Sequence, residues 1–403
     1  MSEALVVIGN GMAAARFAED MSKRALGKYA IAIIGDEPHL AYNRVLLSSV
    51  LAGDVSTSDI ELKPSAWWQS KGVTLRYGCA AHAVDPQSKT VTLADGRVIH
   101  YEKLIFATGS SAARLNIPGI ELKGVHAFRD MNDVAQLLAL AQAKKSVVVI
   151  GGGLLGLEAA YGLVKAGARV SLVHQGNRLM NRQLDDAAAN ILNSRIQNMG
   201  IDVRLNLNTM EICGETEVTG VRLSDGSVIE AESVIVAIGI QPNKDLAAQA
   251  GLKSERGIVV DDAMCTSNPD IFALGECAQH RGTCYGLVEP AYDQSRVLAD
   301  HLAGGVARYH GSIVSTNLKV SGLNVFSAGD YMGEQGDILT WSDPGLGAYK
   351  KLVIDGGVLT GAVLVGDTSD ALWYLSLIRN GTNVDAMRDR MMFGRALCVK
   401  EAA

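Results

Sequence analysis

Two glycine-rich segments, each lying between an apolar run and a helical pattern, constrain the fold of this chain more than any other feature. The first run, Leu5–Ile8, is followed by Gly9-Asn10-Gly11-Met12-Ala13-Ala14. The second run, Val147–Ile150, is followed by Gly151-Gly152-Gly153-Leu154-Leu155-Gly156. In such a segment the first glycine makes the strand-to-helix turn, the second admits a diphosphate, and the third position packs the helix on the sheet. The sequence therefore predicts two dinucleotide-binding units in one polypeptide.

A carboxylate about 20 residues after such a segment binds the ribose hydroxyls of the nucleotide. Asp36, beside Glu37, has this position in the first unit. The second unit ends its next strand with His174-Gln175 and has no such carboxylate. Arg178 follows, either as a ligand of a 2′-phosphate or as a solvated loop charge, so NADH and NADPH both stay open. The assigned residues are Gly9, Gly11, Met12, Ala13, Ala14 and Asp36 in the first unit, and Gly151, Gly153, Leu154, Leu155 and Gly156 in the second.

Composition and charge exclude several classes of protein. Of the 403 residues, 48% are hydrophobic and 20% charged, as in a globular protein, and the net charge of −6 gives no reason to expect nucleic acid as a partner. No apolar run approaches the roughly 20 residues of a membrane span, and the chain begins directly with a strand pattern. We therefore expect a cytoplasmic protein with no membrane partner. The six cysteines form no C-x-x-C pair, so no metal site is expected.

The order of elements in the first unit is repeated in the second. Each has strand, helix and strand, then short strands with Asp-Gly turns, then an apolar strand; in the second unit the short strands are expected after Val170–His174. After Pro242 the chain is expected to return to the first domain. A third region is expected to contain an antiparallel sheet with strands at Leu318–Val320, Val325–Ser327, Ala348–Ile354 and Leu359–Val365. Helices are expected to follow at Ala371–Arg379 and Val384–Met392. The predicted domains are 1–112 with 244–310, 113–243, and 311–403.

Three further segments carry a family resemblance. They are Phe106-Ala107-Thr108-Gly109, Val234–Gly239 with Pro242-Asn243, and Thr266–Glu276. With them, residues 1 to about 305 resemble the FAD-dependent pyridine nucleotide oxidoreductases with a glutathione-reductase-like fold. This resemblance implies an α/β fold with two Rossmann-like dinucleotide-binding domains, followed here by a C-terminal α+β domain.

Within that superfamily the chain is most similar to the flavoprotein module of NAD(P)H nitrite reductase large subunits, and also similar to rubredoxin and ferredoxin reductases. The segments that carry this likeness are Ala41–Ser48, Leu179–Asp185, Gly275–Ala278, Val325–Asp330 and Tyr349–Leu352. Those large subunits continue into iron–sulfur and sirohaem domains, whereas this sequence stops at Ala403 without clustered cysteines. The expectation is an electron-input module that does not reduce nitrite alone.

The resemblance also implies roles for particular residues. FAD occupies the first domain, and NAD(P)H the second, where Glu158 lies near the nicotinamide. Further FAD residues are Arg44, Ala81, Thr108, Gly109, Gly275 and Glu276, and Gly239 joins the NAD(P)H residues. Hydride then passes from nicotinamide to flavin, and electrons leave for a separate acceptor. Two alternatives stay open: a surface salt bridge for Arg44, and a helix-dipole partner for Glu158.

The leading hypothesis is an FAD-dependent NAD(P)H oxidoreductase that serves a redox protein in nitrate or nitrite assimilation. A ferredoxin or rubredoxin reductase of another pathway, and a non-enzymatic flavin- and nucleotide-binding sensor, are the alternatives. A disulfide reductase is disfavoured, because Tyr42-Asn43-Arg44 stands where those relatives place the redox cysteine and no cysteine precedes Cys79. A basic C-terminal stretch, either a docking site for an acidic redox protein or a solvated helix face, consists of Arg388, Arg390, Arg395 and Lys400.

Overall fold

The computed structural model describes residues 2–320, 322–343 and 345–398, which form two compact units. The first unit holds the described residues of Met1–Leu47, Val55–Ser111 and Ile240–Ser312. The second holds those of Ser48–Asp54, Ala112–Gly239 and Ile313–Ala403.

The first unit is built on a five-stranded parallel sheet with the strand order β19-β7-β1-β2-β3. Its elements are β1 (Glu3–Ile8), α1 (Met12–Arg24), β2 (Tyr29–Ile34), a 3-10 helix (Arg44–Leu46), α3 (Ser65–Ser70), β3 (Thr74–Arg76), β4 (Ala81–Asp85), β5 (Thr90–Leu93), β6 (Val98–His100), β7 (Lys103–Phe106), β17 (Ile240–Pro242), α7 (Asp245–Gln249), β18 (Ile258–Val260), β19 (Ile271–Ala273), a 3-10 helix (Gly275–Cys277), β20 (Ala278–His280), β21 (Thr283–Cys284) and α8 (Val288–Ala303). Two elements, α2 (Leu47–Leu51) and β8 (Ser110–Ala112), include residues of both units.

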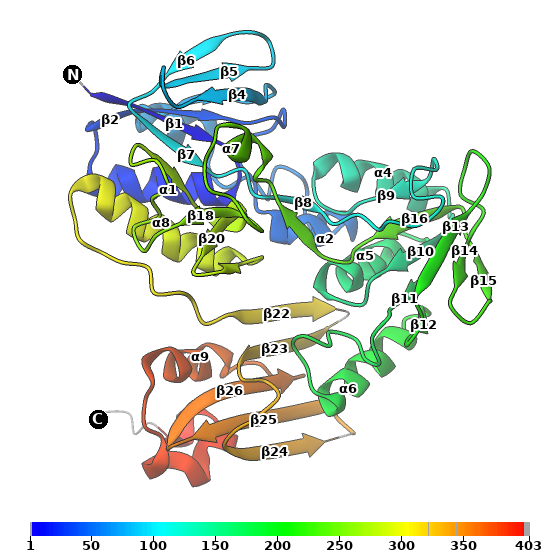
Figure 1. Ribbon diagram of the computed structural model, residues 1–403. Helices are drawn as coiled ribbons and strands as arrows, with labels where there is room; N and C mark the ends of the chain where they lie inside the picture. The colour runs from blue at the N-terminus through cyan, green and yellow to red at the C-terminus, as the bar shows by residue number, and fades with distance from the viewer. Residues whose placement is uncertain (1, 321, 344, 399–403) are drawn as a thin grey trace. The chain divides into compact units, whose positions relative to one another are not determined.

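The core of this unit follows from its apolar periodicity. Helix α1 buries Ala14, Phe17, Ala18 and Met21, which share one face at helical spacing, and it packs beside α8 (Figure 1). Strand β19, far along the chain, pairs with β7 and so returns the chain to this sheet. The central parallel strands β7 and β1 are buried on both faces, which explains the uninterrupted apolar runs in the sequence.

The second unit contains another five-stranded parallel sheet, with the order β12-β11-β10-β16-β9. Its first elements are β9 (Val125–His126), α4 (Met131–Gln142), β10 (Ser146–Ile150), α5 (Leu154–Lys165), β11 (Arg169–Val173), α6 (Asp186–Gln197), β12 (Asp202–Arg204), β13 (Thr209–Cys213), β14 (Gly220–Leu223), β15 (Val228–Glu230) and β16 (Ser233–Val236).

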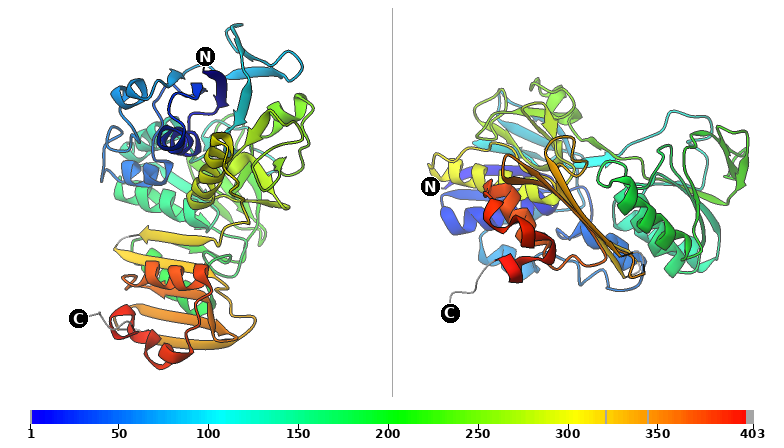
Figure 2. Two further views of the ribbon diagram at one scale, coloured as in Figure 1. Left: turned by 90° about the vertical axis from the view of Figure 1, so that its left-hand side faces the viewer. Right: turned by 90° about the horizontal axis from the view of Figure 1, so that it is seen from below.

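The C-terminal part of the second unit is an antiparallel sheet with the order β22-β23-β26-β25-β24, and α9 lies on one face of it (Figure 2). Its elements are β22 (Ser315–Val320), β23 (Leu323–Gly329), β24 (Asp337–Asp343), β25 (Ala348–Asp355), β26 (Val358–Val365), α9 (Ala371–Asn380), a 3-10 helix (Asp385–Phe393) and α10 (Arg395–Cys398). Asp185, which caps α6, also accepts a hydrogen bond from the Tyr349 hydroxyl (2.7 Å) and pairs with Lys351 Nζ (3.2 Å). Two segments that carry the family resemblance therefore meet here.

The expected fold class is confirmed: two parallel α/β sheets precede a C-terminal α+β region. Two local elements were missed: helix α6 precedes the short strands after β11, and β24 was not expected. The helix expected at Val384–Met392 is present as a 3-10 helix at Asp385–Phe393. The division into three domains stays a prediction.

Candidate functional site

The first glycine segment joins β1 to α1. A Cβ on Gly9 would clash with the Ala107 carbonyl oxygen, so the turn itself needs this glycine. Gly11 is the N-cap of α1 and has no side-chain cap; a Cβ there would meet nothing within 4 Å. The first-turn N–H groups beside Gly11 thus border open space, and a helix N-terminus attracts negative charge. This geometry fits a diphosphate.

Asp36, Thr108 with Gly109, and Gly275 with Glu276 follow the carboxyl ends of β2, β7 and β19, the edge where ligands of open parallel sheets bind. Thr108 Oγ1 donates to the Asn243 carbonyl (2.7 Å), and Asn243 Nδ2 donates to the Thr108 carbonyl (2.9 Å). Ser110 Oγ donates to Glu276 Oε2 (2.6 Å), which brings together residues 166 apart in the sequence. The loops after β7 and β19 are therefore joined to each other.

Gly275 lies against the start of α1. A Cβ on Gly275 would be 3.0 Å from the Cβ of Ala13, and its N–H donates to the buried Gln294 side chain (2.7 Å). Met12 and Ala13 form the first turn of α1, and Ala14 is fully buried. The segment Gly275–Glu276 and the first glycine segment therefore lie next to each other at the start of α1.

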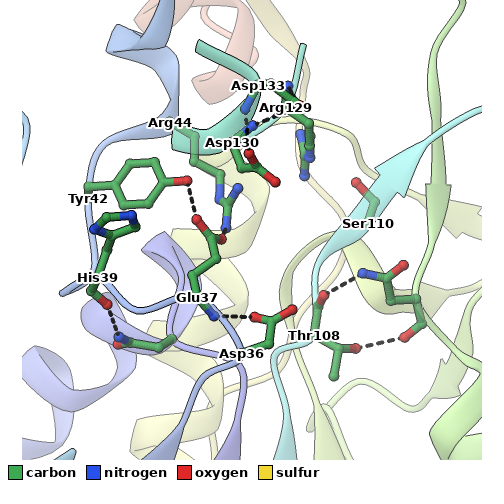
Figure 3. Close-up of polar contacts among 12 residues, drawn as sticks. Asp36, Glu37, His39, Tyr42, Arg44, Thr108, Ser110, Arg129, Asp130 and Asp133 are labelled. Carbon is green, nitrogen blue, oxygen red and sulfur yellow. Dashed lines mark hydrogen bonds and ion pairs between the residues drawn. The ribbon is translucent and has the colours of Figure 1, made fainter. Parts of the chain in front are cut away.

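Asp36 is exposed at the end of β2, and its carboxylate accepts the Glu37 N–H (3.0 Å). Figure 3 shows Tyr42 and Arg44 pointing toward Glu37; the Tyr42 hydroxyl donates to it (2.6 Å), and the Arg44 guanidinium pairs with it. Ala81 begins β4, two residues after Cys79, whose N–H donates to the Gly35 carbonyl (3.0 Å). Asp36, Arg44 and Ala81 therefore all belong to the neighbourhood of the β2 end.

The second glycine segment repeats this geometry between β10 and α5. Cβ atoms on Gly151 and Gly156 would clash with carbonyl oxygens of Ala237 and Gly151, whereas one on Gly153 would meet nothing within 4 Å. Gly153 is the N-cap of α5 without a side-chain cap, and Leu154 and Leu155 begin the helix. Gly239 follows β16, the neighbour of β10. The glycine segment and Gly239 therefore lie at one carboxyl edge, whereas Glu158 stands further along α5.

Glu158 stands in the second turn of α5, and its environment changes its acidity. Burial raises the pKa of the Glu158 carboxyl from 4.5 to about 7, because the charged form loses hydration there. The carboxyl therefore exchanges its proton near neutral pH, with its side chain still partly accessible. A helix-dipole partner is a charged carboxylate, so this shift disfavours that alternative role.

We expect Glu158→Gln to stabilise the protein more at pH 8 than at pH 5. The raised pKa means that the folded state holds the proton more tightly than the unfolded state, so the free energy of unfolding falls as pH rises from 4.5 to about 7. The glutamine amide does not ionise, so the variant keeps the free energy of unfolding that the unmodified protein loses at high pH. The stabilisation at pH 8 should therefore exceed that at pH 5 by about 2 kcal/mol. Urea unfolding at both pH values measures it, with exposed Glu230→Gln as the control. An equal effect at the two pH values would contradict this burial.

Arg178 is not a solvated loop charge, and its role as a ligand of a 2′-phosphate stays a prediction. Its side chain is 17% exposed and donates to the Leu184 carbonyl (3.0 Å) and to Asp186 (2.9 Å), so it fastens the loop after β11 to the start of α6. In the basic C-terminal stretch, Arg388 pairs with Asp337, Arg390 donates to the Ala386 carbonyl, and Lys400 lies outside the described residues.

Several residues that support the site were not assigned from the sequence. Ser110 joins the segment after β7 to the segment after β19, Asn243 joins it to the segment after β17, and Gln294 holds Gly275. His174 was noted only as part of the strand end that lacks a carboxylate. Asn243 and His174 could have drawn attention as polar residues directly after strands of a predicted nucleotide-binding unit.

Two parallel sheets, each with an open N-cap glycine at its carboxyl edge, define an oxidoreductase of the two-dinucleotide class. The sequence model of the pyridine nucleotide-disulphide oxidoreductase family matches residues 3–295, and that of the rubredoxin NAD+ reductase C-terminal domain matches residues 315–382. The chain belongs to the pyridine nucleotide-disulphide oxidoreductase family. The expected enzyme class, FAD and NAD(P)H are confirmed at the level of this family.

Relatives agree with this assignment. The chain is 44% identical over 382 residues to a nitrite reductase [NAD(P)H] of Bacillus subtilis, covering 94% of this chain and 48% of that protein. It is 42% identical over 368 residues to the assimilatory nitrate reductase electron transfer subunit of Bacillus subtilis, covering 91% and 48%. A ferredoxin reductase structure from Rhodopseudomonas palustris matches with a TM-score of 0.85 and 28% identity, covering 92% and 93%. The chain thus spans about half the length of the two curated relatives.

Two further observations concern the described residues. No helix among them has both the length and the apolar character to cross a membrane. Within the same residues, no group of three or more His, Cys, Asp or Glu side chains is arranged to hold a metal ion.

Proposed function

We propose that this chain is an FAD-dependent NAD(P)H oxidoreductase that passes electrons to a separate redox acceptor in nitrate or nitrite assimilation. The observation that carries the proposal is the pair of open N-cap glycines, Gly11 and Gly153, each at the carboxyl edge of its own parallel sheet. The nitrite reductase and the nitrate reductase electron transfer subunit support the pathway. The six free cysteines support action in the cytoplasm, a reducing compartment.

FAD is assigned to the first unit. Gly9, Gly11 and the first turn of α1 would hold its diphosphate, and Asp36 its adenosine ribose. Glu276 would accept a hydrogen bond from the ribityl chain, held in place by Ser110. The flavin, when bound, takes up two electrons from a nicotinamide and can release them singly. The other proposed FAD residues are Met12, Ala13, Ala14, Arg44, Ala81, Thr108, Gly109 and Gly275.

The nicotinamide nucleotide is assigned to the second unit. Gly151, Gly153, Leu154, Leu155 and Gly156 would hold its diphosphate, and Gly239 would border it. Glu158, with a pKa of about 7, can donate a hydrogen bond to the nicotinamide carboxamide when protonated and accept one when ionised. Its proposed role is to orient the ring, and no side-chain acid or base is needed for hydride transfer.

Anaerobic mixing of the FAD-loaded protein with NADH, and separately with NADPH, tests the proposal. Rapid bleaching of the flavin absorbance supports a reductase. The rates of bleaching with NADH and with NADPH show which coenzyme the protein prefers. A stable, unbleached complex would instead favour a flavin- and nucleotide-binding sensor. Reoxidation by a nitrite or nitrate reductase component, compared with ferredoxin and rubredoxin, then identifies the acceptor. A second candidate function is that of a ferredoxin or rubredoxin reductase in another pathway. The similar ferredoxin reductase structure and the match to a rubredoxin reductase C-terminal domain support this candidate.

We expect Glu276→Ala to lower the affinity for FAD about tenfold, because a hydrogen bond to a charged acceptor is lost. Equilibrium dialysis of FAD against the apoprotein measures this. The exposed Glu102→Ala in the same unit is the control and should bind FAD as the unmodified protein does. Wild-type affinity in Glu276→Ala would remove Glu276 from the proposed FAD site.

A further inference from the structure

We infer that His174 is a positioning residue for the nicotinamide nucleotide, because its imidazole holds the glycine segment between β10 and α5 in its binding conformation. This inference rests on the proposed function of the second unit. It adds a residue outside the glycine segment, to which the sequence assigned no role.

The imidazole contacts the glycine segment directly. The N–H of Gly152 donates to His174 Nδ1 (3.2 Å), and Gly152 is buried. A buried N–H without an acceptor is unfavourable, so this hydrogen bond has a structural consequence. Since the N–H is the donor, Nδ1 must be unprotonated. Burial lowers the pKa of His174, which favours the neutral ring that this contact requires.

The loop after β11 holds the other side of the same peptide. Met180 N–H donates to the Gly152 carbonyl (2.8 Å), so both polar groups of Gly152 are paired. Packing adds to this: a Cβ on Gly152 would lie 2.8 Å from His174 Cγ and 2.8 Å from Leu179 Cδ2. A Cβ on Gly176 would lie 2.8 Å from His174 Nε2. The ring is thus fixed between the glycine segment and the loop that follows β11.

This arrangement prepares the nucleotide site before the coenzyme arrives. With the peptide of Gly152 fixed, the adjacent Gly153 keeps its Cβ position open and the first turn of α5 keeps its N–H groups exposed to a diphosphate. Loss of the acceptor would leave the segment free to rearrange, and binding would then have to order it. The expected effect is on coenzyme affinity rather than on the chemical step.

The test compares His174→Leu with His174→Asn. Leucine has a similar volume and no acceptor, whereas the asparagine Oδ1 can stand in for Nδ1. By calorimetry on the FAD-loaded protein, we expect His174→Leu to weaken NAD+ binding about tenfold and His174→Asn to bind within about threefold of the unmodified protein. The KM for NADH should rise in parallel in His174→Leu, with kcat within about twofold, because the ring does not touch the reacting atoms.

Unchanged NAD+ affinity in His174→Leu would overturn the inference. Equal weakening of NAD+ binding in both variants would also overturn it, because that result assigns the effect to packing rather than to the hydrogen-bond acceptor. A test without substitution uses the 15N spectrum of the imidazole: we expect unprotonated Nδ1 and protonated Nε2 at neutral pH. Protonated Nδ1 would overturn the inference even if the leucine variant failed to fold. Failure of the unmodified FAD-loaded protein to bind NAD+ would instead overturn the proposed function, and this inference with it.

Discussion

Replacing Gly153 by valine is expected to abolish useful NAD(P)H binding while FAD stays bound. Gly153 has φ −86° and ψ −174°, an extended conformation that valine adopts readily, and a Cβ there meets no atom of the chain within 4 Å. The fold should therefore tolerate the substitution. The side chain would instead fill the space in which the proposed diphosphate approaches the N-terminus of α5. We expect the dissociation constant for NAD+ to rise about 100-fold or more, which corresponds to about 3 kcal/mol.

Calorimetry with NAD+ measures this loss, and the flavin absorbance per polypeptide shows whether FAD is retained. The circular dichroism spectrum should match that of the unmodified protein. Wild-type affinity for NAD+ in a folded Gly153→Val would remove the nicotinamide nucleotide from this edge of the second parallel sheet.

Replacing Gly11 by valine is expected to have the reciprocal effect and to yield protein with little bound FAD. Gly11 has φ −101° and ψ −168°, and its Cβ position is equally open. Valine there would block the N-terminus of α1, so we expect the affinity for FAD to fall about 100-fold, again about 3 kcal/mol. Equilibrium dialysis of FAD against the apoprotein measures it.

Each variant is the matched control for the other. Both replace an N-cap glycine without a side-chain cap, so the small loss from poorer capping is the same in both. Gly11→Val should retain NAD+ binding, and Gly153→Val should retain FAD. Loss of both ligands in either variant would indicate general unfolding, and loss of the opposite ligand would exchange the two assignments.

Much of the fold could be predicted from local patterns. The apolar runs that became β1, β7, β10 and β16 are visible in the sequence because central parallel strands are buried on both faces. Helix α6 was missed although Asp185 caps it and Ala188, Leu192 and Ile196 repeat at helical spacing. Strand β24 gave a weaker signal, because Trp341 and Ile338 remain exposed on this edge strand.

The candidate site also contains residues that could be assigned from the sequence and residues that could not. The glycine positions could be assigned because their requirement is steric and recurs at fixed spacing in the sequence: Gly9 and Gly151 need close backbone approach, and Gly11 and Gly153 must leave space. The role of Arg178 could not be assigned, since its hydrogen bonds to Leu184 and Asp186 depend on how the loop folds back. The raised pKa of Glu158 could not be predicted from the sequence either, because it arises from burial.

The sequence by itself determined the class of this protein, because strand-to-helix turns that admit a diphosphate impose glycine at fixed spacing, whatever surrounds them. Only the tertiary structure decided which distant groups support those turns. Glu276 with Ser110, Thr108 with Asn243, and His174 with Gly152 come together through strand pairing and loop packing. Such contacts depend on burial and on hydrogen-bond partners far away in the chain, for which a linear sequence has no periodic pattern.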